Sequence, residues 1–199
     1  DPYDQLRTIS HQLHPVWAEK LKDVTGIDTG FRRCGAIYLA TSRAEIATLT
    51  ANQFWWEDHG IEFERLNLKE LLELEPNLAS LAKRDTVHAW RLPGECQLRN
   101  PRHLTALRQA CEIGGVRFLG SAIESLEIQS DGAAAVLDDQ GNRHSAPNIC
   151  LCNGAWTRLL MEQVDLSNGI MPIRGQMLLY KSELPLLTHV INEGSRYLV

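Results

Sequence analysis

The sequence predicts an α+β fold, and three observations predict it. Several segments of the 199 residues repeat apolar side chains at the spacing of a helical turn. Other segments alternate apolar and polar residues, as half-buried strands do. Capping residues, glycines and prolines separate the two kinds of segment. Apolar residues make up 44% of the chain and charged residues 23%, which is typical of a folded globular protein.

Residues 3–21 are expected to form an amphipathic helix, because apolar residues recur there at helical spacing: Leu6, Ile9, Leu13, Val16, Trp17 and Leu21. Pro15 is expected to interrupt this helix, since proline lacks the N–H that an internal helical position donates. Gly26 and Gly30 are expected to end it. Residues 34–41 then form a buried or half-buried strand.

A second helix is expected over residues 42–59. Ser42 is placed to cap it, Glu45 lies three residues on as the partner in a capping box, and Gly60 ends it. The aromatic residues 54–56 lie in this helix. Ordinary helical packing explains them most simply, and a lid over a ligand pocket is the alternative.

Residues 63–76 are expected to form a short strand and a short helix that Asn67 and Glu70 cap and Pro76 ends. A strand and turn follow over residues 86–98. The clearest helix comes next, with Asn100 as its N-cap, Pro101 in its first position, Gly114 and Gly115 at its end, and one apolar face: Leu104, Leu107, Ala110 and Cys111.

The pattern then changes from helical to alternating. The expected strands are residues 116–129, 133–138, 142–146 and the apolar run 148–152, with turns at Asp131–Gly132 and Gln140–Gly141. A tight turn through Gly154 leads into a helix over residues 153–164. A strand, a glycine turn and a helix N-terminus can present backbone N–H groups to an anion.

Residues 168–180, NGIMPIRGQMLLY, pose a question of their own. The apolar run 177–180 is expected to be a strand, and so is the run 196–199. A buried strand has no structural need for four of the residues that precede 177–180: Pro172, Arg174, Gly175 and Gln176. They indicate either an ordinary turn or a backbone that passes close to a ligand.

The charge pattern argues against a nucleic-acid or anionic-membrane partner, because the net charge is −5 and no dense Lys/Arg run occurs. No apolar run reaches the roughly 18 residues of a membrane span, and no signal-peptide pattern is present. The five cysteines suggest free thiols in a reducing cytoplasm. Cys150 and Cys152 are expected to be buried on one face of a strand. His11 and His14 lack partners at metal-ligand spacing, so no metal site is expected.

Six segments in order carry a family resemblance: RRCGAIYLA, LLELEP, NPRHLTALRQACEIGGVRF, ICLCNGAWTRLL, MPIRGQMLLY and RYLV. Together they resemble the D-amino-acid oxidase-like family of FAD-dependent oxidoreductases, in its glycine oxidase branch. The resemblance implies a mixed or antiparallel substrate-domain sheet plus a partial Rossmann-like FAD-domain segment. It assigns residues 1–29 to a connecting helix, 30–95 and 167–199 to the substrate domain, and 96–166 to the FAD domain.

The Gly-x-Gly-x-x-Gly fingerprint that holds the cofactor pyrophosphate in this family does not occur here. The chain therefore resembles an internal fragment of such an enzyme and is expected to be inactive alone. The family carries its substrate-carboxylate arginine in a segment that this sequence also lacks, so no catalytic residue is assigned.

The resemblance also implies residue roles. Tyr197 matches a tyrosine of the substrate pocket, although without the resemblance an ordinary aromatic strand residue is the simpler explanation. The residues implied to lie beside FAD are Ile123, Cys152 (in place of a small alanine), Gly154, Trp156, Arg174, Gly175 and Gln176. For Gly154, the absence of a Cβ would let the backbone approach the cofactor. For residues 174–176, a plain turn or a domain seam is the alternative.

The activity implied is oxidation of a small amino acid or amine by hydride transfer from Cα to FAD N5. Two alternatives stay open. A related enzyme could act on N-methyl amino acids or a polyol phosphate. A non-catalytic binding module could keep the fold without the cofactor fingerprint.

Overall fold

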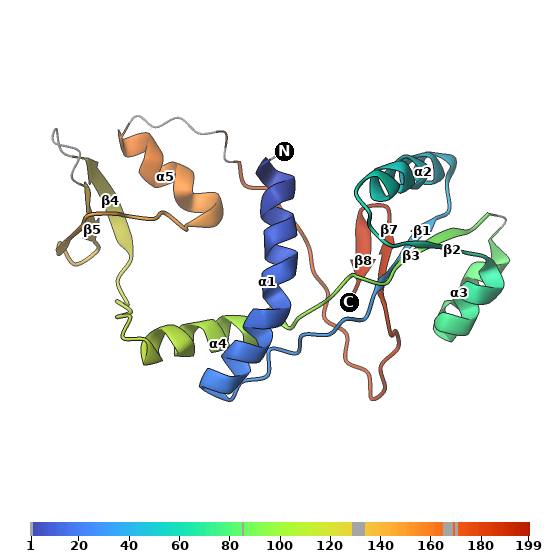
Figure 1. Ribbon diagram of the computed structural model, residues 1–199. Helices are drawn as coiled ribbons and strands as arrows, with labels where there is room; N and C mark the ends of the chain where they lie inside the picture. Colours follow the sequence, from blue (N-terminus) through green and yellow to red (C-terminus); the bar gives the residue numbers. More distant parts are fainter. Residues whose placement is uncertain (1, 85, 129–133, 165–168, 170) are drawn as a thin grey trace. The chain divides into compact units, whose positions relative to one another are not determined.

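The computed structural model describes residues 2–84, 86–128, 134–164, 169 and 171–199. The chain divides into two compact units, Asp1–Val116 with Lys181–Val199 and Arg117–Tyr180. Each unit combines helices with a sheet, which confirms the α+β class (Figure 1). None of the described helices is long and apolar enough to cross a membrane. Because the assignment of segments to a substrate and an FAD domain concerns function, it stays a prediction.

The first unit contains a mixed sheet of five strands in the order β2-β3-β1-β7-β8. The central strand β1 (Ala36–Ala40) pairs antiparallel with β3 (His88–Leu92) and parallel with β7 (Val190–Glu193). The edges are β2 (Glu64–Leu66), antiparallel to β3, and β8 (Arg196–Leu198), antiparallel to β7. The sheet therefore joins two segments separated by about a hundred residues of sequence.

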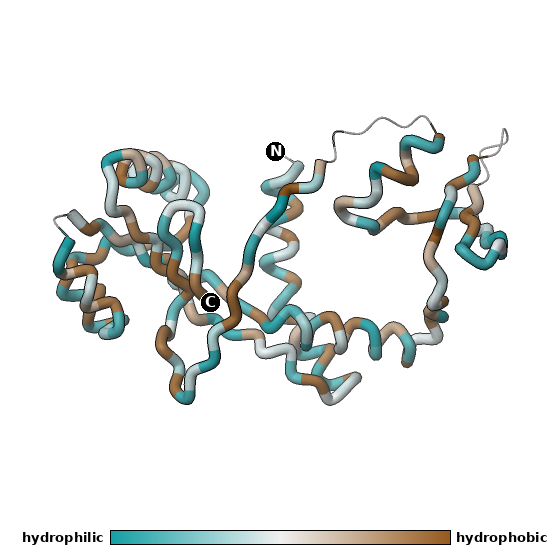
Figure 2. The backbone as a smooth tube through the Cα atoms, turned by 180° about the vertical axis from the view of Figure 1, so that it is seen from behind, coloured by the Kyte–Doolittle hydropathy of each residue, from teal (hydrophilic) through white to brown (hydrophobic). Residues whose placement is uncertain are grey.

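Helices cover both faces of this sheet. Successive side chains of β1 point to opposite faces, and apolar residues on each face are buried against a helix. One buried cluster lies towards α3 (Leu68–Leu74) and the 3-10 helix η1 (Pro76–Lys83): Ile37, Leu39, Leu71, Leu81, Ala89 and Ile191. The other lies towards α2 (Arg43–Asp58): Ala40, Leu49, Trp56, Trp90 and Leu92. Figure 2 shows hydrophobic colour along the strands between more hydrophilic helices.

The predicted caps of α2 and α3 are confirmed. Ser42 and Glu45 form a complete capping box at α2, and Asn67 and Glu70 form another at α3. The predicted aromatic cluster in α2 splits: Trp56 is buried in the core, Trp55 stacks on His59 with ring centroids 4.2 Å apart, and Phe54 is exposed. Helical packing therefore accounts for Trp56 only.

Helix α1 (Pro2–Thr25) runs through Pro15 without a break, so the predicted interruption is wrong. Proline removes a single internal donor, and the remaining hydrogen bonds of a 24-residue helix maintain it. The end at Gly26 is confirmed, where a φ of +72° suits glycine.

Helix α4 (Asn100–Ile113) begins one residue earlier than predicted, with Arg99 rather than Asn100 at the N-cap. Its predicted apolar face is also displaced. Leu104 and Cys111 are exposed, whereas His103 and Ala106 are buried. The reason is that α4 packs against α1, which covers the face that carries His103.

The second unit contains an antiparallel three-stranded sheet of β4 (Ile123–Ile128), β5 (Ala134–Asp138) and β6 (Arg143–Ala146). This confirms the predicted antiparallel strands, while the predicted turn at 131–132 lies outside the described residues. The 3-10 helix η2 (Gly154–Trp156) follows, then α5 (Thr157–Met161) and the 3-10 helix η3 (Glu162–Val164). The predicted glycine turn into a helix is therefore present, but the helix is short.

Three predicted strands are wrong in whole or in part. Residues 116–122 precede β4 without strand pairing, and residues 148–152 and 177–180 have no strand assignment. A strand needs a hydrogen-bonded neighbour, and no ladder of the described residues includes these segments. Apolar side chains along them are instead exposed: Val116, Phe118, Leu119, Met177, Leu178, Leu179 and Tyr180.

Candidate functional site

The first candidate segment lies in the second unit, where Cys152, Gly154 and Trp156 follow one another into α5. Gly154 has a φ of +56°, and a Cβ placed there would meet nothing within 4 Å. Backbone conformation therefore requires glycine at this position, whereas crowding does not. The amide N–H of Trp156 donates to the carbonyl of Asn153 at 3.1 Å, so the turn already uses that donor. The indole of Trp156 is left 70% exposed.

A hollow of about 330 Å³ lies beside Trp156 in the same unit. It is lined by Ala155, Trp156, Arg158, Leu159, Glu162 and Pro172. On one wall, Arg158 Nε donates to Glu162 Oε1. Because Trp156 and Pro172 share the hollow, the structure brings together the two stretches in which the sequence predicts cofactor contacts. An exposed indole next to a proline ring offers a flat apolar surface suited to a planar ring system.

Arg174, Gly175 and Gln176 lie just beyond Pro172 and are all exposed. Residues 171–180 are assigned neither helix, strand nor turn. A Cβ at Gly175 would meet nothing within 4 Å, and its φ is not in the left-handed region. Neither space nor backbone conformation therefore requires glycine there. Both the Arg174 and the Gln176 side chain can donate hydrogen bonds, and neither donates one to another described residue.

Ile123 and the two cysteines complete the predicted set in this unit. Ile123 begins β4, pairs with Asp138 and is partly exposed. Cys150 and Cys152 are both exposed, so their predicted burial on a strand is wrong. Their sulfur atoms lie 3.4 Å apart as free thiols. The hydrogen bond and charge of Cys150 raise the pKa of the Cys152 thiol. An extended segment without strand partners leaves both thiols uncovered.

Tyr197, the predicted substrate contact, lies on the edge strand β8 in the first unit. It pairs with Asn192 of β7, which pairs with Tyr38 of β1, which pairs with Trp90 of β3. Directly paired residues project from the same face of a sheet, so these four form one row. Trp90 is fully buried at one end of the row and Tyr197 is 61% exposed at the other.

Tyr38 and Asn192 are the two interior members of this row, and Tyr38 is the one with a shifted pKa. Its hydroxyl donates to Glu95 Oε1 at 3.4 Å. Burial first, and then the charge and hydrogen bond of Glu95, raise the pKa of Tyr38 to about 12. The phenol is therefore neutral at ordinary pH and serves as a hydrogen-bond donor.

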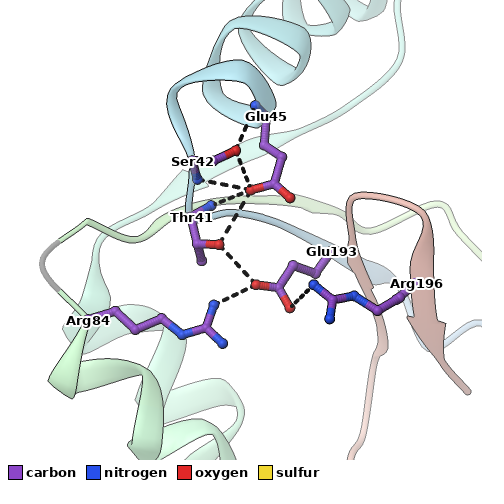
Figure 3. A network of polar contacts seen from close by, with 6 residues as sticks. All are labelled: Thr41, Ser42, Glu45, Arg84, Glu193 and Arg196. Carbon is purple, nitrogen blue, oxygen red and sulfur yellow. Dashed lines mark hydrogen bonds and ion pairs between the residues drawn. The ribbon is translucent and has the colours of Figure 1, made fainter.

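A polar network that the sequence did not predict ties the β7–β8 hairpin to the rest of the first unit (Figure 3). Glu193 Oε1 accepts from Arg84 at 2.6 Å and from the Thr41 hydroxyl at 3.0 Å, and Arg196 lies 3.7 Å from Glu193 Oε2. The Thr41 backbone N–H donates to Glu45 of the α2 cap at 3.0 Å. This hydrogen bond above all, and then that of the Ser42 side chain, lowers the pKa of Glu45.

A second unpredicted contact is formed by Glu75, which is 1% exposed. Its Oε1 accepts from the backbone N–H and hydroxyl of Thr188, at 2.8 and 2.5 Å. It also accepts from the backbone N–H and Nδ1 of His189, at 2.7 and 2.8 Å. Burial, the largest influence, raises the pKa of Glu75, but these hydrogen bonds together outweigh it and lower the pKa. The partners lie 113 and 114 residues away in sequence, where no local pattern could reveal them.

No group of three or more His, Cys, Asp or Glu side chains in the described ranges is arranged to hold a metal ion. The structure thus contains two separate candidate features, one in each unit. One is the hollow beside Trp156 with the stretch after Pro172. The other is the sheet row that ends at Tyr197.

Comparison with known proteins adds a family. The family model described as FAD dependent oxidoreductase (DAO) matches residues 2–198. Glycine oxidase of Geobacillus kaustophilus is 33% identical over 199 residues, which cover 100% of this chain and 52% of that protein. The bifunctional protein ThiO/ThiG of a Synechocystis strain is 29% identical over 189 residues, covering 94% of this chain and 25% of that protein.

Solved structures agree on the fold. The crystal structure of glycine oxidase from Geobacillus kaustophilus matches with a TM-score of 0.89 and 27% identity, over 99% of this chain and 52% of that chain. Glycine oxidase from Bacillus cereus matches with a TM-score of 0.87 and 20% identity, over 99% of this chain and 53% of that one. The chain thus spans about half the length of the glycine oxidases that it matches.

Proposed function

Because the chain belongs to the DAO family of FAD-dependent oxidoreductases, we propose that the protein containing it oxidises a small amino acid or amine. The observation that supports this most directly is the match to a glycine oxidase over the whole of this chain. Glycine or a similarly small amino acid is the substrate that we propose first. The cofactor of this family, FAD, would accept the hydride that leaves the substrate Cα.

We propose that residues of the second unit hold part of the cofactor. Trp156 and Pro172 provide a flat apolar surface in the hollow. Gly154, two residues before Trp156, makes a left-handed turn that leaves the backbone there without a side chain. Arg174 and Gln176 supply exposed donors that suit the anionic and carbonyl oxygens of a dinucleotide.

The chain lacks the glycine-rich fingerprint of a pyrophosphate site, so these residues are proposed to contribute only part of the binding energy. We expect the 199-residue chain alone to bind FAD weakly or not at all. Isothermal titration calorimetry would measure this, and micromolar binding by the isolated chain would contradict the assignment.

For the first unit, we propose that Tyr197 donates a hydrogen bond to the substrate from the exposed end of the sheet row. Its side chain is accessible to a ligand because Tyr197 is 61% exposed at the sheet edge. The chain would thus position the substrate, while the bound cofactor carries out the redox chemistry.

The decisive test uses the product of the complete reading frame. We expect the purified protein to be yellow, and its flavin absorbance to bleach when glycine is added without oxygen. A colourless protein that releases no flavin on denaturation would exclude the proposal and favour a non-catalytic binding module. A panel containing N-methyl amino acids and a polyol phosphate would identify a related substrate class.

The role of Arg174 can be tested in the same protein. Loss of a charged hydrogen bond to the cofactor should weaken flavin affinity about tenfold in Arg174→Ala. Arg108→Ala is the matched control, because Arg108 is an arginine of the first unit that forms an exposed ion pair with Glu112 on α4. If Arg174→Ala leaves flavin affinity and turnover at the control level, residues 172–176 are a plain connection.

A further inference from the structure

We propose that Glu193 is a positioning residue that holds the β7–β8 hairpin, and with it Tyr197, in place at the sheet edge. The proposal rests on the proposed function in one respect, which is that Tyr197 contacts the substrate. Glu193 itself would touch neither substrate nor cofactor.

Strand β7 is held in the sheet by its pairing with β1 and by buried Ile191, whereas β8, the outer strand of the hairpin, has little else to hold it. Strand β8 contains three residues, all of them exposed, and it pairs with β7 alone among the described strands. A two-stranded hairpin alone is marginally stable, so β8 depends on how firmly β7 is held in the sheet. The exposed residues Tyr197 and Leu198 contribute little buried apolar area. Polar contacts therefore decide how firmly this edge is fixed.

Glu193 provides such contacts to two separate elements. Arg84 follows η1 and donates to Glu193 Oε1 at 2.6 Å, and Thr41 follows β1 and donates to the same oxygen at 3.0 Å. Arg196 adds a second positive charge from within the hairpin, 3.7 Å from Oε2 (Figure 3). The side chain of Glu193 is only 19% exposed, against 47% for Arg84, so the carboxylate is the less hydrated partner. Hydrogen bonds between charged groups are the strongest of their kind.

The turn of the hairpin is fixed by the same group of residues. Gly194 has a φ of +59°, and a Cβ placed on it would lie 3.0 Å from Glu45 Oε1. Glu45 is in turn held by the α2 cap through Ser42 and Thr41. The hairpin turn is therefore packed against a carboxylate whose own position is fixed.

Sheet geometry separates Glu193 from the substrate contact. Glu193 pairs with Arg196, and the neighbouring pair is Asn192 with Tyr197. Adjacent pairs project from opposite faces of a sheet, so Glu193 and Tyr197 lie on opposite faces. A change at Glu193 removes no side chain from the face that carries Tyr197. Its effect can reach Tyr197 only through the position of the strand.

The test compares Glu193→Ala and Glu193→Gln with wild type in the complete gene product. Glu64→Ala is the matched control, because Glu64 pairs with Arg91 at 3.3 Å on β2, the opposite edge of the same sheet. Hydrogen exchange over residues 190–198 measures how firmly the hairpin is held, without reference to activity. The KM and kcat for the small amino acid measure the consequence for the substrate.

In Glu193→Ala we expect hairpin exchange about tenfold faster and KM about tenfold higher, with kcat nearly unchanged. Glu193→Gln should show a smaller effect in both, because its amide oxygen still accepts from Thr41 and Arg84. Glu64→Ala should match wild type over residues 190–198.

Wild-type exchange of the hairpin in Glu193→Ala would overturn the proposal. Faster exchange with unchanged KM, or a loss confined to kcat, would also overturn it. If the wild-type protein oxidises no amine, the proposed function fails by itself, and the hairpin exchange alone then decides whether Glu193 positions this edge.

Discussion

Replacement of Glu75 by glutamine tests how strongly the contact of Glu75 with Thr188 and His189 stabilises the first unit. The substitution keeps the size of the side chain but removes its charge. In the wild type, one carboxylate oxygen accepts four hydrogen bonds from Thr188 and His189. The neutral glutamine oxygen accepts more weakly than a carboxylate. The glutamine NH₂ group can only donate, and its neighbours here are donors as well. The change therefore affects a contact between the residue that joins α3 to η1 and the residues that precede β7.

The expected magnitude follows from these contacts. Hydrogen bonds to a charged group contribute about 1.5–3 kcal/mol each, against about 0.5–1.5 kcal/mol for neutral ones. Four bonds on a single oxygen do not add fully, so we expect a loss of about 2–4 kcal/mol in the free energy of unfolding. For a chain of this size, this corresponds to a fall in Tm of about 10 °C.

The effect should depend on pH in a defined direction. The pKa of Glu75 is lower in the folded protein than its ordinary value. Its stabilising contribution is therefore fully present above the unfolded-state pKa of about 4.3 and is lost as pH falls through the lower folded-state pKa. The difference between wild type and Glu75→Gln should shrink below about pH 4, because the protonated acid resembles the amide.

Thermal unfolding followed by circular dichroism at pH 7 and at pH values below 4 measures both effects. Glu73→Gln is the matched control on the neighbouring helix α3, since Glu73 forms an exposed pair with Lys69 at 3.8 Å. We expect this control to change stability by less than about 0.5 kcal/mol. If Glu75→Gln melts together with Glu73→Gln at pH 7, the reasoning about the buried carboxylate is refuted.

Two further substitutions test local features. Ser42→Ala should cost about 1 kcal/mol, because it removes the side-chain acceptor of the α2 capping box, and chemical denaturation would measure the loss. Asp138→Asn should accelerate amide exchange over β5 and β6. The hydrogen bond from His144 above all, and then those from Asn142 and Gln140, lower the pKa of Asp138 despite burial. This acceleration should therefore be present at pH 7 and diminish in strong acid, and its absence at pH 7 would count against the role of Asp138.

Local determinants explain what the sequence could predict. The caps at Ser42 and Asn67 involve partners three residues away, so their geometry follows from helix formation itself. The end of α1 at Gly26 is local in the same way. The antiparallel β4–β5–β6 sheet also follows chain order, and the alternation of apolar residues was sufficient to indicate it.

Partners distant in sequence explain what could not be predicted. Strand β7 pairs in parallel with β1, about 150 residues earlier, and its four residues carry no distinctive pattern. The apolar runs 148–152 and 177–180 do have a strand pattern but no partner in the described sheets. Alternation therefore reports the tendency of a segment to pair, whereas the pairing itself depends on the neighbour.

The same distinction applies to the candidate site. The family resemblance predicted Tyr197 and the residues around Gly154 as contacts. It gave no indication of the interactions that hold the strands beside Tyr197. Arg84 and Glu193 are 109 residues apart, and Glu75 and Thr188 are 113 apart. Such contacts appear only when the sheet brings the two segments together.

These two carboxylates act at opposite ends of the same short strand. Glu75 binds Thr188 and His189 immediately before β7, and Glu193 is the last residue of β7. Strand β7 sets the position of β8 through three residue pairs. A slip of one residue would turn every side chain of β8 to the other face of the sheet. Contacts at both ends of β7 fix that strand, and the three residue pairs then set the position of β8 and the face on which Tyr197 lies.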